Sequence, residues 1–215
     1  MDKFLEEKKQ SLLLHWKTGR TIMDDRLLAA FEATPREKFI LKKDSYNAYG
    51  DYPLSIPCKQ TISQPTTVML MLQALEIAEG MNILEVGAGS GYQAALLSKM
   101  TGASGLVITI EYFRELADFA ESNLKKSECT NVNVIQGDGG LGFEAEAPYD
   151  RIIVACACPS VPPPLLEQLK TGGIMVIPTK KRMYEDMQVI KKTAAGVKTE
   201  SIGGFTFVPL RGKYV

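Results

Sequence analysis

The chain has 215 residues, of which 45% are apolar and 23% are charged, and its 25 basic residues balance its 25 acidic residues. This length favours one domain, or one domain with an appendage, and the apolar content suffices for a sizeable core. The neutral charge argues against a dedicated nucleic-acid binder, and a single histidine, His15, argues against a Ser-His-Asp triad and against zinc sites built on several histidines.

Two amphipathic patterns before residue 32 predict two helices, with Asp24 as the N-cap of the second. The segment from Asp44 to Pro65 is rich in glycine and proline and shows no periodicity, so we expect an irregular loop. Loops longer than about 15 residues are uncommon unless they are functional. The apolar pattern over residues 68–75 predicts a third helix, which ends near residue 80.

From residue 81 onward, apolar runs of strand length alternate with helical stretches. The predicted strands are 81–86, 106–110, 132–136, 151–155 and 174–177, and the predicted helices are 91–100, 113–125 and 162–170. Short apolar runs bounded by glycine are typical of strands buried on both faces, as in a parallel sheet. Their alternation with helices implies right-handed βαβ units.

The last predicted strands are 187–190 and 197–210, which are joined through glycine turns and expected to be antiparallel. The expected fold is therefore α/β: a doubly wound, mostly parallel Rossmann-like sheet with an N-terminal helical cap and antiparallel C-terminal strands. We assign residues 1–80 to the cap and active-site loop and residues 81–215 to the core, packed together as one compact unit.

Four cysteines are too few for a disulfide scaffold, and the charged N-terminus does not resemble a signal peptide. The longest uncharged stretches, 60–75 and 152–166, are shorter than the roughly 20 residues of a membrane helix, and both contain proline. We expect a cytoplasmic protein with reduced thiols that does not associate with membranes. Cys156 and Cys158 are expected to lie in a strand as small buried residues.

A glycine-rich turn follows the first strand of the predicted core, in the segment Glu85–Gly91. Glycine lets the chain leave the strand sharply and removes side chains where a ligand approaches the backbone. The N-terminus of the next helix offers unpaired N–H groups to a polar or negative ligand. A tight strand–helix turn without a ligand is the alternative for this motif taken alone.

Two acidic residues follow at the ends of the next predicted strands. Glu111 lies 24 positions after Gly87, close to the spacing of about 20 at which a carboxylate accepts hydrogen bonds from a ribose diol. Asp138 is placed to accept a hydrogen bond from an adenine amino group, although Asp-Gly is also common in turns. Because ligands of open α/β sheets bind at the carboxyl ends of the strands, these three turns are expected to converge on one cofactor.

The order of a strand-end glutamate, G-x-G-x-G, an acid and Gly-Asp resembles class I S-adenosylmethionine methyltransferases. No G-x-x-x-x-G-K-[ST] loop is present, and NAD binding is the weaker interpretation. Three further segments narrow the resemblance: 60–65 (QTISQP), 147–154 (APYDRIIV) and 207–210 (FVPL). Together with Glu85–Tyr92 they resemble protein-L-isoaspartate O-methyltransferases, from about Pro35 to Leu210.

The resemblance implies methyl transfer from S-adenosyl-L-methionine, which leaves S-adenosyl-L-homocysteine, to the free α-carboxylate of an L-isoaspartyl residue in a damaged protein or peptide. The methyl ester then cyclises to a succinimide, which hydrolyses partly to normal aspartate. The implied partners are isoaspartyl proteins and peptides, without nucleic acid or a metal ion, and the expected state is a monomer.

The resemblance also implies the site residues. The active-site serine is Ser63, and the substrate loop around it contains Gln60, Thr61 and Ile62. The implied cofactor-binding residues are Glu85, Gly87, Ala88, Gly89, Ser90, Gly91, Glu111, Tyr112, Asp138 and Gly139.

This chemistry requires no general base, because a carboxylate with an ordinary pKa near 4 is already ionised at neutral pH. Alignment of the reacting atoms can by itself contribute about 7–11 kcal/mol. We therefore expect Ser63 to orient a reacting group by hydrogen bonding and not to form a covalent bond, with Thr61 as a candidate assistant. The alternative for Ser63 is an N-cap of the helix that begins at Pro65.

The chain departs from the family at Pro57–Lys59, where a Gly-x-Gly is usual. The change stiffens the predicted loop at the substrate entrance and adds a cation. Two alternatives therefore remain open. One is a methyltransferase for another carboxylate, a small molecule or a nucleic acid, and the other is a catalytically silent homologue that binds the cofactor and recognises peptides.

Overall fold

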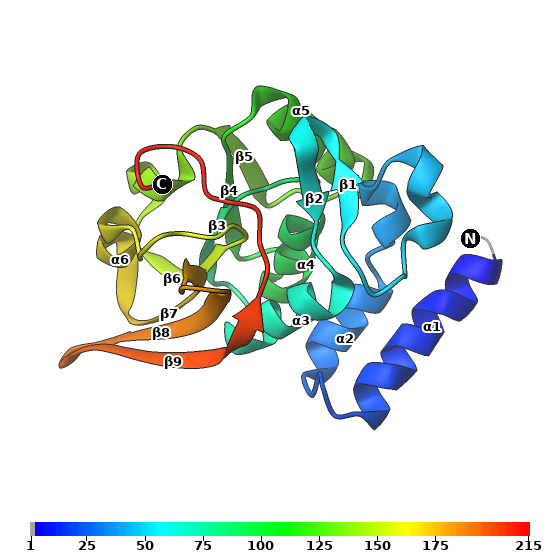
Figure 1. Cartoon of the computed structure of the whole chain (residues 1–215), viewed down its shortest axis with the longest axis horizontal. Coiled ribbons are helices and arrows are strands. Elements are labelled where there is room, and N and C mark those ends of the chain that lie inside the picture. The colour runs from blue at the N-terminus through cyan, green and yellow to red at the C-terminus, as the bar shows by residue number, and fades with distance from the viewer. Residues whose placement is uncertain (1–2) are drawn as a thin grey trace.

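The computed structural model describes residues 3–215 (Figure 1). The helices are α1 (Lys3–Thr18), α2 (Asp25–Glu32), α3 (Pro65–Ala74), α4 (Tyr92–Thr101), α5 (Arg114–Lys126) and α6 (Pro163–Gln168). The strands are β1 (Leu54–Ile56), β2 (Gln60–Ile62), β3 (Asn82–Val86), β4 (Leu106–Glu111), β5 (Val132–Gln136), β6 (Tyr149–Val154), β7 (Leu169–Lys180), β8 (Glu185–Thr193) and β9 (Gly196–Phe205).

Seven strands form one sheet in the order β5-β4-β3-β6-β7-β8-β9. The first five run parallel, and β8 and β9 are added antiparallel at one edge. The chain builds outward from β3 to β5 and then returns to place β6 on the other side of β3. The expected α/β fold with antiparallel C-terminal strands is therefore confirmed, and its topological switch lies between β3 and β6.

The central strands are buried on both faces, which explains their uninterrupted apolar runs. Ile83, Val107 and Ile153 belong to one apolar cluster, whereas their strand neighbours Leu84 and Ile108 belong to a second cluster. Side chains alternate between the two faces of a strand, so the two clusters mark the two sides of the sheet. The first contains residues of α2 to α5, and the second contains residues of α6.

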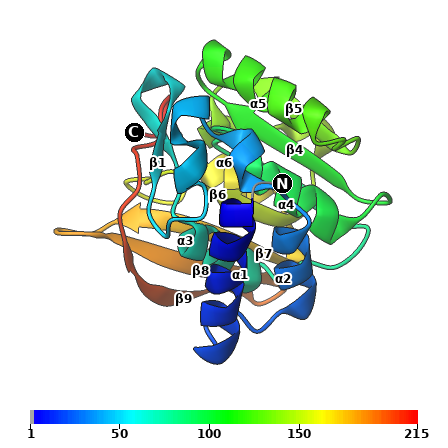
Figure 2. The ribbon, with the colours of Figure 1, turned by 90° about the vertical axis from the view of Figure 1, so that its right-hand side faces the viewer.

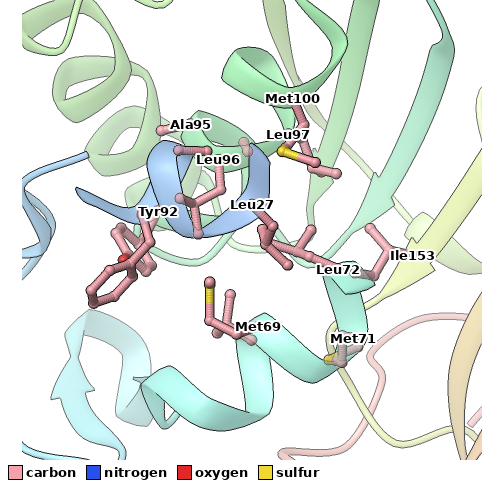
Figure 3. Packing of buried hydrophobic residues seen from close by; sticks show 14 of the residues in the cluster. Leu27, Met69, Met71, Leu72, Tyr92, Ala95, Leu96, Leu97, Met100 and Ile153 are labelled. Carbon is pink, nitrogen blue, oxygen red and sulfur yellow. The ribbon is translucent and has the colours of Figure 1, made fainter. Parts of the chain in front are cut away.

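The N-terminal helices pack on the first of these clusters. Figure 2 views this cap with α1 nearest the viewer, and Figure 3 shows Leu27 of α2, Met69 of α3 and Leu96 of α4 meeting in the cluster. Trp16 of α1 is fully buried, and its Nε1 donates to Thr66 Oγ1 at 2.8 Å. The boundary at residue 80 stays a prediction of the sequence, because one continuous cluster joins cap and core.

Asp24 is the N-cap of α2, as predicted, and its Oδ1 accepts hydrogen bonds from the backbone N–H groups of Arg26 at 2.9 Å and Leu27 at 3.2 Å. The prediction of a wholly irregular segment over residues 44–65 was wrong. It contains two short 3₁₀ helices and the antiparallel hairpin of β1 and β2, in which Leu54 pairs with Ile62. Three-residue strands show too little alternation to be detected in a sequence.

Other boundaries also differ from the prediction. The sixth helix ends at Gln168, and the strand predicted over 174–177 extends over twelve residues as β7. The strand predicted over 197–210 ends at Phe205 as β9, and the segment after it runs back toward the ends of the central strands (Figure 1). Register in β7 is decided by pairing with β6 and β8, which local sequence does not encode.

The four cysteines are free thiols, in agreement with the prediction. Cys156 and Cys158 are buried as expected, but they follow the end of β6 and are not within a strand. No helix in residues 3–215 combines the length and the apolar character required to cross a membrane. Within the same residues, no group of three histidine, cysteine, aspartate or glutamate side chains is arranged to hold a metal ion.

Candidate active site

A cavity opens at the carboxyl ends of the central strands, beside the topological switch. It encloses about 780 Å³ of empty space, open solvent at its mouth included. Its floor is formed by Val86 at the end of β3, Ile110 at the end of β4 and Ala155 just after β6. Ligands of open α/β sheets bind at this position, because the strand order reverses there and the connections after the two neighbouring strands leave toward opposite faces of the sheet, with a crevice between them.

The glycine turn forms one wall of this cavity, and its glycines have the backbone conformation that their residue type allows. Gly87, Gly89 and Gly91 have φ values of 94°, 54° and 83°, in the left-handed region that other residues rarely adopt. A side chain at Gly91 would also meet the carbonyl oxygen of Ala120, since a Cβ there would lie 3.1 Å away. The turn therefore requires glycine for its own geometry.

Glu111 joins the turn to the end of β4. Its carboxylate is buried, and it accepts hydrogen bonds from Gly89 N at 2.9 Å and from Phe113 N at 3.1 Å. A carboxylate has about four acceptor positions, so two remain for the hydroxyl groups of a ligand. Tyr112 follows it in the chain and also lines the cavity, and the residue is 47% exposed.

The opposite wall is formed by Gln60, Thr61, Ile62 and Ser63. The β1–β2 hairpin brings these residues over the glycine turn, where a Cβ on Gly89 would lie 3.4 Å from Ile56 Cδ1. The structure therefore brings together the predicted substrate loop and most of the predicted cofactor motif, although about twenty residues separate them in the sequence.

Ser63 lies between β2 and α3, and its hydroxyl has no hydrogen-bond partner within residues 3–215. The N-cap position of α3 is Gln64, not Ser63. The side chain of Asp51 caps the start of α3 instead, because Asp51 Oδ1 accepts a hydrogen bond from Thr66 N at 2.9 Å. The alternative role of Ser63 as an N-cap is thus not supported, and its hydroxyl is free to bind a ligand.

A second, open groove adjoins the cavity. It is lined by residues 204–208, which comprise the end of β9 and the segment after it, together with Pro53, Gln64 and Thr67. Both the cavity and the groove are lined by Thr61, Ser63, Ala155 and Val208. Ser63 therefore stands where the cavity and the groove meet, which is the position required of a residue that contacts both of two reacting molecules.

Three predicted cofactor residues, Glu85, Gly91 and Asp138, are not among the residues that line the cavity. Asp138 Oδ1 accepts from Gly140 N at 2.9 Å, and its Oδ2 accepts from Lys213 N at 2.7 Å, so the C-terminal segment covers this carboxylate. Glu85 is fully buried beneath the glycine turn and accepts a hydrogen bond from Thr109 Oγ1. Gly139, next to Asp138, does line the cavity.

The turn at Pro57–Lys59 keeps a conformation suited to glycine. Cys58 and Lys59 have φ values of 57° and 58°, in the left-handed region. Lys59 stands where the resemblance leads one to expect the second glycine of a Gly-x-Gly, and its left-handed backbone is strained because the residue has a Cβ. Cys58 Sγ lies 3.5 Å from Glu115 Oε2 at the start of α5.

The sequence-based assignment of site residues missed two groups that line the cavity. Ala155 and Cys156 follow β6, which becomes a neighbour of β3 only through the return of the chain from β5. Pro209, Leu210 and Arg211 arrive from the C-terminal end. The only sequence signal for the latter was the FVPL segment at 207–210, which supported the resemblance but carried no role of its own.

Comparison with known proteins agrees with this geometry. The family model described as protein-L-isoaspartate(D-aspartate) O-methyltransferase matches residues 7–214. A protein named protein-L-isoaspartate O-methyltransferase from Methanosarcina mazei is 43% identical over 208 residues, which are 97% of this chain and 85% of that protein. One of the same name from Methanopyrus kandleri is 42% identical and covers 99% of this chain and 95% of its own length.

Solved structures are similar over the whole fold. A structure of a protein-L-isoaspartate O-methyltransferase superposes with a TM-score of 0.86 at 28% identity, covering 96% of this chain and 67% of that one. A Plasmodium falciparum protein described in the same terms, in complex with S-adenosyl-L-homocysteine, has a TM-score of 0.82 at 26% identity and covers 94% of this chain and 97% of its own.

The buried Glu85 carboxyl makes stability depend on pH. Burial raises its pKa from 4.5 to about 8. The folded protein thus holds this proton more tightly than the unfolded chain does between these values, and in that window stability falls as pH rises. Glu85→Gln carries no titrating proton at this position. We therefore expect the free energy of unfolding of Glu85→Gln, relative to that of the wild type, to increase as the pH is raised from about 5 to about 9.

Urea unfolding at several pH values measures this difference, with Glu121→Gln on the exposed surface of α5 as the control. The difference between the control and the wild type should change much less with pH. A constant difference for Glu85→Gln would show that the Glu85 carboxyl does not titrate with a raised pKa.

Proposed function

The chain belongs to the protein-L-isoaspartate O-methyltransferase family, and we propose that Ser63 is its active-site serine, standing between a cofactor cavity and a substrate groove. The protein is a repair enzyme that transfers a methyl group from S-adenosyl-L-methionine to the α-carboxylate of L-isoaspartyl residues in damaged proteins and peptides. The observation that supports the site assignment is that Ser63 lines both the cavity and the groove, at the point where they meet.

The residues around the cavity suit an adenosyl cofactor. The buried Glu111 carboxylate has acceptor positions left for a ribose diol, and Gly87 and Gly89 line the cavity without a side chain that would keep a ligand from the backbone. When bound, S-adenosyl-L-methionine supplies an electrophilic methyl group. In this proposal Glu111 and the turn hold the nucleoside part, and Tyr112 and Gly139 border it.

Glu85 and Asp138 take a different place in the proposal. Because neither lines the cavity, Glu85 supports the turn from beneath and Asp138 holds the C-terminal segment through Lys213 N. Ala155 and the segment from Pro209 to Arg211 are added as residues that enclose the cofactor.

In this proposal the groove receives the substrate polypeptide, because it adjoins the cavity at Ser63 and is lined by the consecutive residues 204–208. The substrate carboxylate is ionised and needs no base, in keeping with the only histidine, His15, being exposed on α1. The free Ser63 hydroxyl donates a hydrogen bond that orients this carboxylate, and Thr61 borders the same junction. Positioning of this kind accounts for a large share of the rate of such a transfer.

The remaining parts of the proposal concern the state and location of the protein. We propose that the protein is a monomer, and that it does not bind nucleic acid because its charge is balanced. A cytoplasmic location is proposed because all four cysteines are free thiols, which persist in a reducing compartment. The division into a cap over residues 1–80 and a core over residues 81–215 is proposed as a description of one compact unit.

Incubation with S-adenosyl-L-methionine and a matched pair of peptides, one isoaspartyl and one aspartyl, tests the function directly. We expect methyl esterification of the isoaspartyl peptide only. Methylation of neither peptide, with S-adenosyl-L-homocysteine still bound, would favour the silent homologue. Equal methylation of both would indicate another carboxylate specificity.

Ser63→Ala tests the role of the serine hydroxyl. A hydrogen bond to a charged group is worth about 1.5–3 kcal/mol, so we expect kcat to fall about 10- to 100-fold with little change in the Kd of S-adenosyl-L-homocysteine. Ser55→Ala, at an exposed serine of the same hairpin that lines neither hollow, is the control and should keep the wild-type kcat. An unchanged kcat for Ser63→Ala would remove Ser63 from the reaction.

Glu111→Ala tests the ribose contact. We expect the affinity for S-adenosyl-L-homocysteine to fall by roughly 1–3 kcal/mol, because ligand hydroxyls lose their acceptor. Isothermal titration calorimetry measures this change, and Glu121→Ala on α5 serves as the control. Unchanged affinity for Glu111→Ala would exclude the proposed contact.

A further inference from the structure

Arg36 lies directly behind the wall that carries Ser63. Its side chain is fully buried, in a 3₁₀ helix over Arg36–Phe39 of the cap. None of the ion pairs among residues 3–215 includes Arg36. Burial of a guanidinium without a carboxylate partner costs desolvation free energy, so the hydrogen bonds and ring contact that Arg36 makes are expected to have a structural or functional role.

The contacts of Arg36 link three separate segments. Its Nη2 donates to the carbonyl oxygen of Ser63 at 2.8 Å, and its Nε donates to the carbonyl oxygen of Ala48 at 2.9 Å. The guanidinium carbon lies 5.0 Å from the centre of the Tyr92 ring. Ser63 and Tyr92 both line the cavity, so one planar cation contacts two of its walls and the cap at once.

The surroundings of Arg36 keep the guanidinium in one orientation. Tyr49 OH accepts from Arg36 N at 3.3 Å and donates to Glu37 Oε2 at 2.7 Å, which fixes the backbone that carries the side chain. Burial lowers the pKa of Arg36 to about 10, which leaves it charged at neutral pH. Asp51 holds the chain on the other side of Ser63, at the start of α3, by accepting a hydrogen bond from Thr66 N.

We propose that Arg36 is a positioning residue for methyl transfer, which fixes the Ser63 segment over the cofactor cavity through the Ser63 carbonyl. The proposal rests on the proposed function. Its physical basis is that the Ser63 hydroxyl has no hydrogen-bond partner within residues 3–215, so its position is decided by the backbone that carries it. Small misplacements of a positioning group can lower a rate about 100-fold.

Arg151 provides a matched control. It is also a buried arginine that donates to backbone carbonyls, with Nη1 2.8 Å from Asp150 O and Nη2 2.9 Å from Glu76 O. It lies in β6 and lines neither the cavity nor the groove. Replacement of Arg151 therefore removes a comparable buried cation without touching the Ser63 segment.

The experiment compares Arg36→Lys and Arg36→Met with Arg151→Lys and Arg151→Met. For each folded variant, kcat and KM are measured with the isoaspartyl peptide, the Kd of S-adenosyl-L-homocysteine by calorimetry, and stability by urea unfolding. We expect kcat of Arg36→Met to fall at least about tenfold, Arg36→Lys to fall less, and Kd to change less than about threefold. The Arg151 variants should lose stability and keep kcat within about twofold of the wild type.

Other results would overturn the assignment. These are a wild-type kcat in the Arg36 variants, an equal loss of kcat in the Arg151 variants, or a Kd raised more than about tenfold, which would assign Arg36 to the cofactor through Tyr92. If Arg36→Met does not fold, the comparison of Arg36→Lys with Arg151→Lys decides, and failure of both Arg36 variants to fold assigns Arg36 to stability alone. An inactive wild type would instead overturn the proposed function on which the assignment rests.

Discussion

The site depends on the hydrogen bonds that tie the glycine turn to the end of β4. Gly87 N and Ala88 N both donate to the carbonyl oxygen of Ile110, at 2.8 Å and 3.2 Å, and Gly89 N donates to Glu111 Oε2. These bonds satisfy backbone groups that would otherwise be left unpaired in a buried turn. They also bring the turn and the acid into one cavity wall, so that the same contacts that stabilise the fold define the cofactor site.

The second constraint is the hairpin that covers this turn. The hairpin of β1 and β2 places Ser63 across the cavity from the glycine turn, and Asp51 takes over the hydrogen bonds at the start of α3. Because Asp51 meets this local requirement, the Ser63 hydroxyl remains available. The free hydroxyl is thus a consequence of the packing of the cap, and the further role inferred for Arg36 extends the same argument to the backbone of Ser63.

The turn at Pro57–Lys59 has a backbone that suits glycine although it contains none. Cys58 and Lys59 have the left-handed backbone that glycine adopts readily, and β1 and β2 on either side of them pair in antiparallel register. The chain accommodates the strain because the surrounding hairpin holds this turn on both sides. Lys59 adds a cation next to Gln60, which lines the cavity.

The sequence by itself determined the alternating βαβ core, the glycine turn, the Asp24 cap and the family resemblance, because these depend on local periodicity and on residues with special backbone freedom. Only the tertiary structure decided that β6 returns beside β3, that the C-terminal segment covers Asp138, and that Ser63 stands at the junction of two hollows. These features join residues far apart in the chain, and contacts of that kind follow from strand pairing and packing, which no local pattern encodes.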